Sequence, residues 1–246
     1  MKKALTIGGA VLGFLLISAL VIFIFFPGLP TYIKVKHKYK HIDEKVPVFE
    51  AVSAGADFKE YTIKGVKLKA PGDWELKESG NGIASSSLNA SLFLEALNYE
   101  DYYASYDSEL GYDPWTSYNY TEDDYKHFFN TLGIKTNPYD LSDNILWYIR
   151  DSFTAKDCLK LRSKDRKVFA ELAESKEAAY QEEKMWKIKN DSYTGYVGQF
   201  FAYGYTGNMW TFTFFPVGDE VNKYSIMMKC PDETIAKQII SSIELE

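Results

Sequence analysis

The sequence predicts an α+β fold in which an antiparallel sheet is flanked by helices and preceded by one transmembrane helix. Three observations carry this prediction: an uncharged N-terminal run, short alternating apolar segments near both ends of the remaining chain, and apolar positions at helical spacing elsewhere. With 246 residues, 46% of them hydrophobic and 25% charged, the composition is that of a folded protein. We expect a short basic N-terminus and membrane helix over residues 1–30, a juxtamembrane linker over 31–57 and one globular α+β domain over 58–246.

The N-terminal run extends from Ala4 to Phe26 and contains 23 residues without a charge. A helix needs about 20 such residues to cross the hydrocarbon core of a bilayer. A cleaved signal peptide is the alternative, but the run is long for one and no small-x-small cleavage site precedes Pro27. We therefore predict an uncleaved signal-anchor, which ends at Pro27-Gly28-Leu29-Pro30 because proline cannot continue a helix.

The orientation of this single-pass anchor is predicted from two arguments. Basic residues lie on both sides of the run, Lys2 and Lys3 before it and Lys34 to Lys40 after it, so the positive-inside rule does not decide the orientation. However, the short basic N-terminus is similar to the start of a signal peptide, and long domains translocate largely regardless of charge. We expect the domain to be extracytoplasmic, on a protein of the cell membrane whose first partner is the lipid bilayer.

Residues 31–57 are basic at first and then rich in small side chains, as in a tether. His37 and His41 are spaced i, i+4, which on a helix could place both imidazoles on one metal ion, but no third ligand is near. A solvated tether is the favoured interpretation, and a basic patch that touches anionic headgroups is the alternative.

The domain begins near Phe58 and alternates between strand and helix patterns. Helix boundaries come from capping residues: Thr121 and Gly133 bracket one helix, Ser142 starts a second, and Asp232 starts the last. A third helix is expected from about Ser163 to Glu183. Strands are expected at Tyr61–Ile63, Val66–Ala70, Ser91–Leu97, Met185–Lys189, Tyr193–Tyr203, Met209–Phe215 and Lys223–Cys230.

Charge and cysteine usage narrow the function. Residues 58–246 carry 21 basic and 30 acidic residues, so the domain is not built to neutralise phosphates and nucleic acid is not an expected partner. Cys158 and Cys230 permit one disulfide, but the strand alternation around Cys230 favours a small buried hydrophobe. No phosphate-binding loop, nucleophile elbow, zinc-ligand pair or calcium loop is present in the sequence, and we expect no cofactor or metal.

The most unusual window runs from Glu78 to Tyr125, with ten acidic residues, no Lys or Arg, eight Tyr and Trp115. Tyr and Trp offer apolar faces with a polar group and recur at recognition surfaces. We predict a ligand-binding loop there, for a protein or cell-wall glycan partner, although simple packing over the sheet would explain the same residues. The candidate binding residues are Tyr102, Tyr103, Tyr106, Tyr112, Trp115, Tyr118, Asp101, Asp107 and Asp113.

Three functional classes follow from these patterns. We expect a membrane-anchored extracytoplasmic binding or assembly module without catalytic activity. The first alternative is a cell-envelope hydrolase or transferase whose carboxylates converge only in the fold; its candidates are Glu100, Asp101, Asp107, Glu109 and Asp113. The second alternative is a purely structural stalk domain.

Two segments are similar to PsbP-like domains. The hairpin from Tyr61 to Trp74, with its Pro71-x-x-Trp74 turn, resembles the opening of that family, and residues 223–243 resemble its last strand and closing helix. Together they cover about 35 residues, and the middle of the chain departs from the pattern. The resemblance implies an antiparallel sheet between helices and a role in protein binding and assembly. It implies no active-site residue.

Overall fold

The computed structural model of the chain describes residues 24–98, 120–134, 151–200, 208–219 and 221–246, together with the single positions 14, 18 and 21. The chain divides into two compact units. What we call the helical unit comprises Met1–Lys45, Trp115–Thr136 and Asn144–Ala178. What we call the sheet unit comprises Val46–Pro114, Asn137–Asp143 and Ala179–Glu246.

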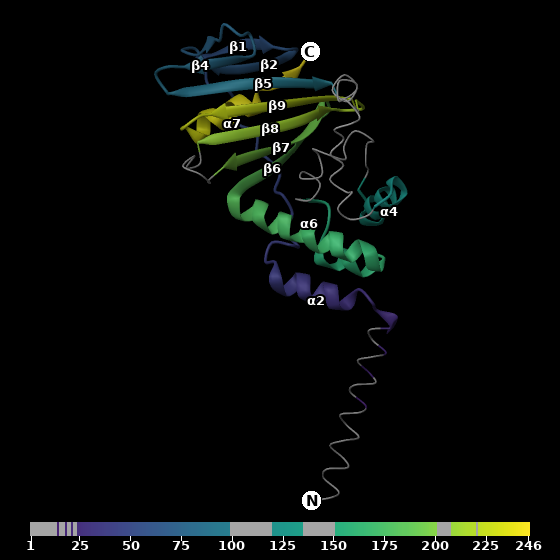
Figure 1. The fold of residues 1–246 in the computed structure, drawn as a ribbon. Helices are drawn as coiled ribbons and strands as arrows, with labels where there is room; N and C mark the ends of the chain where they lie inside the picture. Colours follow the sequence, from purple (N-terminus) through teal and green to yellow (C-terminus); the bar gives the residue numbers. More distant parts are fainter. Residues whose placement is uncertain are drawn as a thin grey trace, which may run out of the picture. The chain divides into compact units, whose positions relative to one another are not determined.

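The described elements confirm an α+β fold with antiparallel sheets (Figure 1). The helices are α2 (Leu29–Lys38), α4 (Glu122–Leu132), the 3-10 helix η3 (Ala155–Lys160), α6 (Ser163–Glu182) and α7 (Glu233–Ser241). The strands are β1 (Phe58–Ile63), β2 (Val66–Pro71), β3 (Glu75–Leu76), β4 (Gly82–Ser85), β5 (Ala90–Asn98), β6 (Glu183–Lys189), β7 (Tyr193–Phe200), β8 (Met209–Pro216), β9 (Asn222–Lys229) and β10 (Glu244–Leu245).

The strands of the sheet unit form two sheets. Seven strands run in the order β3-β4-β5-β9-β8-β7-β6, and three run in the order β1-β2-β10. Every pair of neighbouring strands is antiparallel. Strand β5 pairs with β9, whose sequence lies about 130 residues away, along Ser91↔Lys229 to Asn98↔Asn222. The N-terminal and C-terminal strand patterns therefore build one sheet together.

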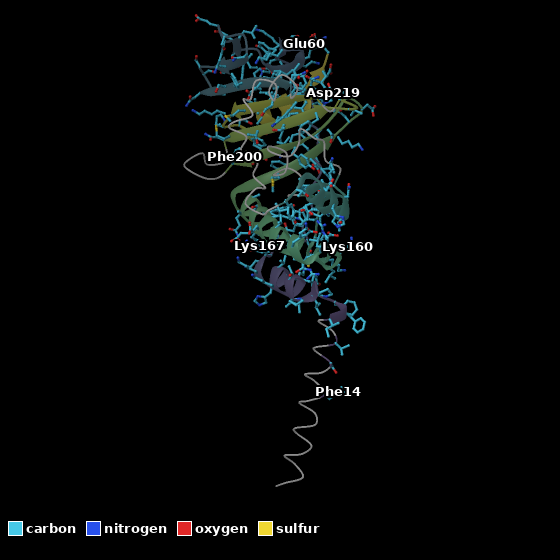
Figure 2. All side chains as sticks on the ribbon, turned by 45° about the vertical axis from the view of Figure 1, so that its right-hand side comes forward. Phe14, Glu60, Lys160, Lys167, Phe200 and Asp219 are labelled. Atoms are coloured by element: carbon cyan, nitrogen blue, oxygen red, sulfur yellow. The ribbon has the colours of Figure 1, made fainter. Side chains whose placement is uncertain are left out.

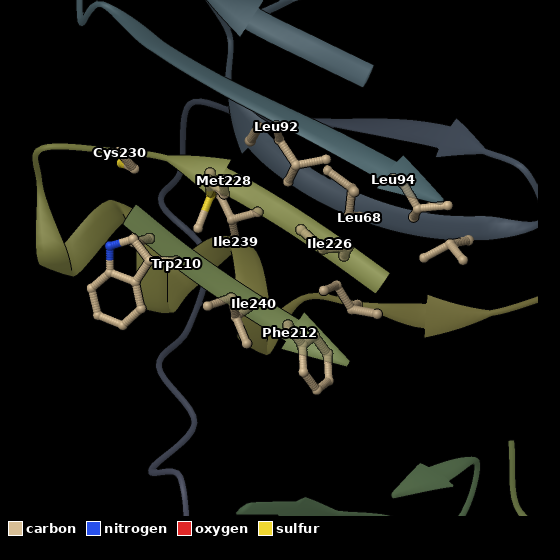
Figure 3. Packing of buried hydrophobic residues seen from close by; sticks show 14 of the residues in the cluster. Leu68, Leu92, Leu94, Trp210, Phe212, Ile226, Met228, Cys230, Ile239 and Ile240 are labelled. Atoms are coloured by element: carbon tan, nitrogen blue, oxygen red, sulfur yellow. The ribbon is translucent and has the colours of Figure 1, made fainter. Parts of the chain in front are cut away.

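The core of the sheet unit lies between the seven-stranded sheet, the three-stranded sheet and α7. Alternate residues of β8, among them Trp210 and Phe212, point to one face of the sheet, where Ile239 and Ile240 of α7 cover them (Figure 3). Cys230 is 1% exposed in the same cluster, and both Cys158 and Cys230 are free thiols. The isoleucines at helical spacing in α7 thus form its packing face.

Local capping signals place the helix ends as expected. Thr121 Oγ1 accepts the N–H of Asp124 at 3.3 Å, and the Asp124 carboxylate accepts the N–H of Thr121 at 3.2 Å. Gly133 ends α4 with φ 73°, a left-handed conformation that glycine adopts without strain. Asp232 Oδ1 accepts the N–H groups of Thr234 and Ile235 at the start of α7. The helix predicted after Ser142 falls mainly outside the described residues.

Helix α2 is a finding that the sequence patterns did not predict. It occupies part of the segment 31–57 that we expected to be a linker, and its Val35 is fully buried. Pro30 lies in the first turn, where proline is tolerated because its missing N–H would have no helical partner. The proposed boundaries of linker and domain stay a prediction.

The predicted transmembrane helix falls largely outside the described residues. Among the helices that are described, none is both long and apolar enough to cross a bilayer. Glu60 of the sheet unit and Lys167 of the helical unit, both labelled in Figure 2, are exposed.

Candidate binding site at a sheet edge

Strand β6 is the last strand of the seven-stranded sheet, and a short segment covers part of its outer edge. The Lys187 N–H donates to the Pro47 carbonyl at 2.8 Å, and the Phe49 N–H donates to the Lys187 carbonyl at 2.9 Å. Val48 forms the parallel bridge between them. The segment Pro47–Phe49 therefore caps β6 at Lys187.

Beyond Lys187 the edge is open. Backbone groups of a strand alternate between its two sides, so the N–H and C=O of Lys189 point the same way as those of Lys187. Within the described part of the chain, no hydrogen bond to these Lys189 backbone groups is found. The chain that covers Lys187 does not continue far enough along β6 to pair with them.

A pocket of about 540 Å³ lies at this place, entirely within the sheet unit. Val48 lines one side, and the ends of β6 and β7 line the other, with Lys187, Lys189, Thr194 and Tyr196. Two ammonium groups, a hydroxyl and a phenol are donors that suit a carboxylate or another acceptor-rich group. Among the described residues, the Lys189 ammonium has no ion-pair partner.

The β6–β7 hairpin holds the pocket in shape. Asn190 Oδ1 accepts the N–H groups of Ser192 at 2.9 Å and Tyr193 at 2.8 Å, which closes the turn at Asn190-Asp191. Gly195 lines the pocket, and no larger side chain fits there, because an added Cβ would lie 2.3 Å from the Thr213 carbonyl oxygen of the neighbouring strand. The hairpin therefore presents backbone and long polar side chains to the pocket.

A second polar cluster lies in the helical unit around Asp165, which is fully buried. The Tyr120 hydroxyl donates to Asp165 Oδ1 at 2.6 Å, and Arg162 Nε donates to Asp165 Oδ2 at 2.8 Å. Burial opposes the charge of Asp165, but the hydrogen bonds from Arg162 and Tyr120 outweigh it and lower the pKa of the carboxyl. Burial and the neighbouring Asp165 raise the pKa of Tyr120, so the phenol stays a donor.

The same cluster extends to the start of α4. Arg162 also bonds to Asp124 at 3.2 Å, and Lys164 contacts the same carboxylate and holds the pKa of Asp124 at about 2. These groups join the first turn of α4 to the first turn of α6. The cluster contains no nucleophile beside a base, so we assign it a structural role.

Lys176 of α6 is the third candidate, because a fully buried lysine with a shifted pKa is typical of functional sites. Its Nζ donates to the carbonyls of Ile42 at 2.9 Å, Glu44 at 2.9 Å and Phe153 at 3.0 Å. Burial lowers the pKa of Lys176 to about 8. All three N–H bonds of the ammonium are used, so Lys176 joins three chain segments and is not available to a substrate.

The residues predicted to bind a ligand are not among those described. Tyr102, Tyr103, Tyr106, Tyr112, Trp115, Tyr118, Asp101, Asp107 and Asp113 all lie outside the described residues, as do Glu100 and Glu109. The described tyrosine at the end of the same window, Tyr120, is buried in the Asp165 cluster. The prediction for the acidic-aromatic window stays a prediction.

Sequence reasoning missed the pocket at the β6 edge. Its two sides come from Val48 and from residues about 140 positions later, and no local pattern indicates that they meet. The one available signal was the apolar stretch Val46-Pro47-Val48-Phe49, which interrupts the small and polar residues of the expected linker. Two of these four residues, Val46 and Phe49, are buried.

The described residues include no arrangement of ligands for a metal ion, and the chain has no close relative among known families. In the described residues, no group of three or more His, Cys, Asp or Glu side chains is arranged to hold a metal ion. His41, one of the two spaced histidines, instead lies 3.0 Å from Glu177, measured from Nδ1 to Oε1. No protein-family model matches the chain, and no curated protein is significantly similar to it.

Proposed function

We propose that the chain is a membrane-anchored extracytoplasmic binding or assembly module, without catalytic activity, that takes an extended segment of a protein partner at the β6 edge. The observation that carries the proposal is the open backbone edge at Lys189 beside the pocket. Addition of a strand to an exposed sheet edge is a recurrent way of binding peptides.

The chemistry of the edge favours a particular kind of segment. Main-chain hydrogen bonds to the N–H and C=O of Lys189 would extend the sheet by one strand next to Pro47–Phe49. A carboxylate side chain on that strand would lie near the ammonium groups of Lys187 and Lys189, which line the pocket. The expected partner segment is therefore extended and carries an acidic residue.

The membrane part of the proposal draws on the N-terminal side chains. Phe14, which Figure 2 labels, is 72% exposed to solvent, and Ile24, Phe25 and Phe26 are also exposed. Bare apolar side chains of this kind are costly in water and are typical of a segment that lies in lipid. The resemblance of residues 61–74 and 223–243 to PsbP-like domains supports a role in assembly rather than catalysis.

The proposal is tested with a photo-crosslinking amino acid at Val48, which is exposed and lines the pocket, in the full chain in its own membrane. We expect a discrete adduct with a protein partner. Lys189→Pro removes the outward N–H at an edge position where proline is tolerated, and should reduce the adduct at least fivefold.

The matched control is Leu76→Pro on β3, the opposite edge of the same sheet. Its N–H also points outward, because the neighbouring Lys77 N–H bonds inward to Gly82 at 2.9 Å. This variant should keep the adduct. Equal adduct yields from the two proline variants would exclude strand addition at β6.

The acidic-aromatic window is tested separately. The full chain and a variant with Tyr102, Tyr106 and Trp115 changed to Ala are used to capture partners from envelope extracts. If that window contributes to binding, the variant should lose the partner identified by crosslinking at Val48. Equal recovery by both proteins would remove the window from the proposal and leave the β6 edge unaffected.

A further inference from the structure

Helix η3 lies directly against Gly28, two residues after Phe26 at the end of the apolar N-terminal run. An added Cβ on Gly28 would lie 2.8 Å from the Leu159 Cα and 2.9 Å from the Cys158 carbonyl oxygen. The Gly28 carbonyl also lies 3.8 Å from the Cys158 Sγ. Two segments that are 130 residues apart in sequence are thus in backbone contact within the helical unit.

This contact sets how far η3 can be from a membrane. Gly28 follows Phe26, the last residue before Pro27 interrupts the apolar run, by two positions, and two residues span at most about 7 Å. The headgroup region on one side of a bilayer is roughly 6 Å thick, since the whole bilayer exceeds its hydrocarbon core by about 10–15 Å. If the run crosses the bilayer, as the proposed function holds, Gly28 and η3 lie at headgroup depth.

The exposed side chains of η3 and of Phe26 are of the kinds that occur at a membrane–water interface. Leu159 of η3 is 43% exposed and Phe26 is 61% exposed. Lys156 and Lys160 are exposed on either side of Leu159. Lys160 bonds to Asp157 at 2.9 Å, whereas Lys156 has no ion-pair partner among the described residues.

Helix α2 also has an exposed apolar side chain beside lysines. Val35 and Tyr39 are buried against the unit, and the opposite face of the helix presents Ile33, which is 55% exposed. Lys34 and Lys36 flank Ile33 along the sides of this face. Both are exposed, and Lys36 forms an ion pair with Asp43. An exposed apolar side chain flanked by lysines is found on helices that lie in the interface plane.

We propose that α2 and η3 form one lipid-contacting surface, on which Leu159 and Ile33 enter the acyl boundary and the lysines take the headgroups of anionic phospholipids. The surface has a second function beyond contact. Because it combines two separate chain segments, it fixes the orientation of the helical unit on the membrane, which a single membrane helix followed by a tether could not do. The inference rests on the membrane anchor of the proposed function.

The contact is tested with a spin label at Leu159→Cys in the full chain, in nanodiscs of zwitterionic lipid with or without one quarter phosphatidylglycerol. The native cysteines are buried, and burial raises the pKa of both thiols to about 11, so the unsubstituted chain serves as the labelling blank. We expect the label to collide more often with oxygen than with a water-soluble nickel complex. The reference is Leu76→Cys, an exposed leucine of the sheet unit (57% exposed, against 43% for Leu159), whose label should collide more with nickel.

The preference for anionic lipid is tested by replacing Lys34 and Lys156 with Gln. In the parent, anionic lipid should lower the collision rate with nickel at position 159 by severalfold, and 1 M salt should abolish this change. The double variant should lose the lipid dependence, while Lys64 and Lys77 replaced by Gln in the sheet unit should retain it. An equal response of both double variants would overturn the role of these lysines.

The outcomes separate this inference from the proposed function. A label at 159 that is as open to nickel as the label at 76, in a chain that resists extraction from membranes by alkaline carbonate, overturns the lipid-contacting surface alone. Release of the chain by carbonate overturns the anchor and with it this surface. Neither result bears on partner crosslinking at Val48.

Discussion

The helical unit and the sheet unit differ in the polar side chains that they bury. The charged residues that are buried among those described, Asp124, Asp165, Lys176 and Glu177, all belong to the helical unit. The buried polar residues described in the sheet unit, Ser85, Gln199 and Thr213, are neutral. Both units have buried apolar side chains, but among the described residues only the helical unit also buries charged ones.

The difference follows from how each unit is built. In the sheet unit, ladders between strands satisfy the backbone, so side chains need only fill the space between sheets and α7. The helical unit joins separate pieces of chain, such as residues 42–44, 153 and α6, which share no backbone ladder. Buried ions that bond to several partners hold such segments in one arrangement, although burying a charge costs desolvation free energy. Substitutions in each unit can therefore test whether the contrast holds.

Truncation of the apolar cluster in the sheet unit should cost the most stability. Phe212→Ala removes a fully buried ring that contacts Tyr193 and Phe214, with centroids 5.8 and 4.6 Å away. We expect a loss of about 4 kcal/mol in the free energy of unfolding, from transfer and cavity terms. A denaturant titration measures this free energy, and hydrogen exchange in β7 to β9 locates the loss. Phe93→Ala, on an exposed position of the same sheet, is the control and should cost less than about 1 kcal/mol.

The next effect is on the helical unit. Lys176→Met keeps the volume of the side chain but leaves the carbonyls of Ile42, Glu44 and Phe153 without their donor. Buried acceptors left without a donor cost about 1–3 kcal/mol, so with three such carbonyls we expect a loss of about 3 kcal/mol in the free energy of unfolding. We expect faster hydrogen exchange in α6, whereas Lys167→Met, on an exposed position of the same helix, should change it little. Similar exchange in both variants would mean that the buried ammonium does not hold the three chain segments together.

A smaller effect is expected at Asp165. Tyr120→Phe removes one of its donors and leaves Arg162 as the partner. A hydrogen bond to a buried charged group contributes about 2 kcal/mol. Thermal unfolding of this variant is compared with that of Tyr32→Phe, a partly exposed tyrosine of α2. An equal change in the two variants would contradict the importance of the Asp165 cluster.

The depressed pKa of Lys176 gives a pH dependence. Its pKa is about 8 in the folded chain and 10.5 in the reference state, so the unfolded chain binds more protons between these values. Stability therefore rises with pH through this window, by about 1.5 kcal/mol between pH 8 and 9.5. The free energy of unfolding of the parent minus that of Lys176→Met isolates this contribution from other titrating groups. A difference that stays flat from pH 7 to 10 would contradict it.

An ion pair at the surface of the sheet unit should matter least. Glu233 and Lys237 form an i, i+4 pair on α7 at 2.8 Å, and the Lys237 ammonium lies 5.5 Å from the centroid of the Trp186 ring. Lys237→Ala should cost only about 0.5 kcal/mol, because both side chains remain partly in water. A double-mutant cycle with Glu233→Gln measures the pair. A coupling energy as large as the stability loss expected for Lys176→Met would contradict the contrast between the two units.

Several elements could be predicted from the sequence because their signals are local. Thr121 and Gly133 bracket α4, and Asp232 starts α7, as capping chemistry predicts. The strand alternation at 223–230 correctly places Cys230 in the core. These patterns report on backbone geometry and on burial of one face, which neighbouring residues already encode.

Other elements could not be predicted because their stability comes from distant residues. Helix α2 was expected to be part of a linker, since its segment is rich in lysine. Its Val35 is buried and Lys38 bonds to Glu174 of α6, a contact that no local window contains. The candidate site was placed in the acidic-aromatic window by composition, which the described residues leave untested.

Local sequence is sufficient for the antiparallel α+β class, the helix boundaries with capping residues and the apolar faces of the strands, because each is written in the periodicity of a few adjacent residues. The folded structure alone establishes that Val48 closes part of the β6 edge, that η3 lies on Gly28 and that Lys176 joins three segments. Each of these contacts joins residues far apart in the chain. Their free energy depends on geometry that folding creates, so no local pattern carries it.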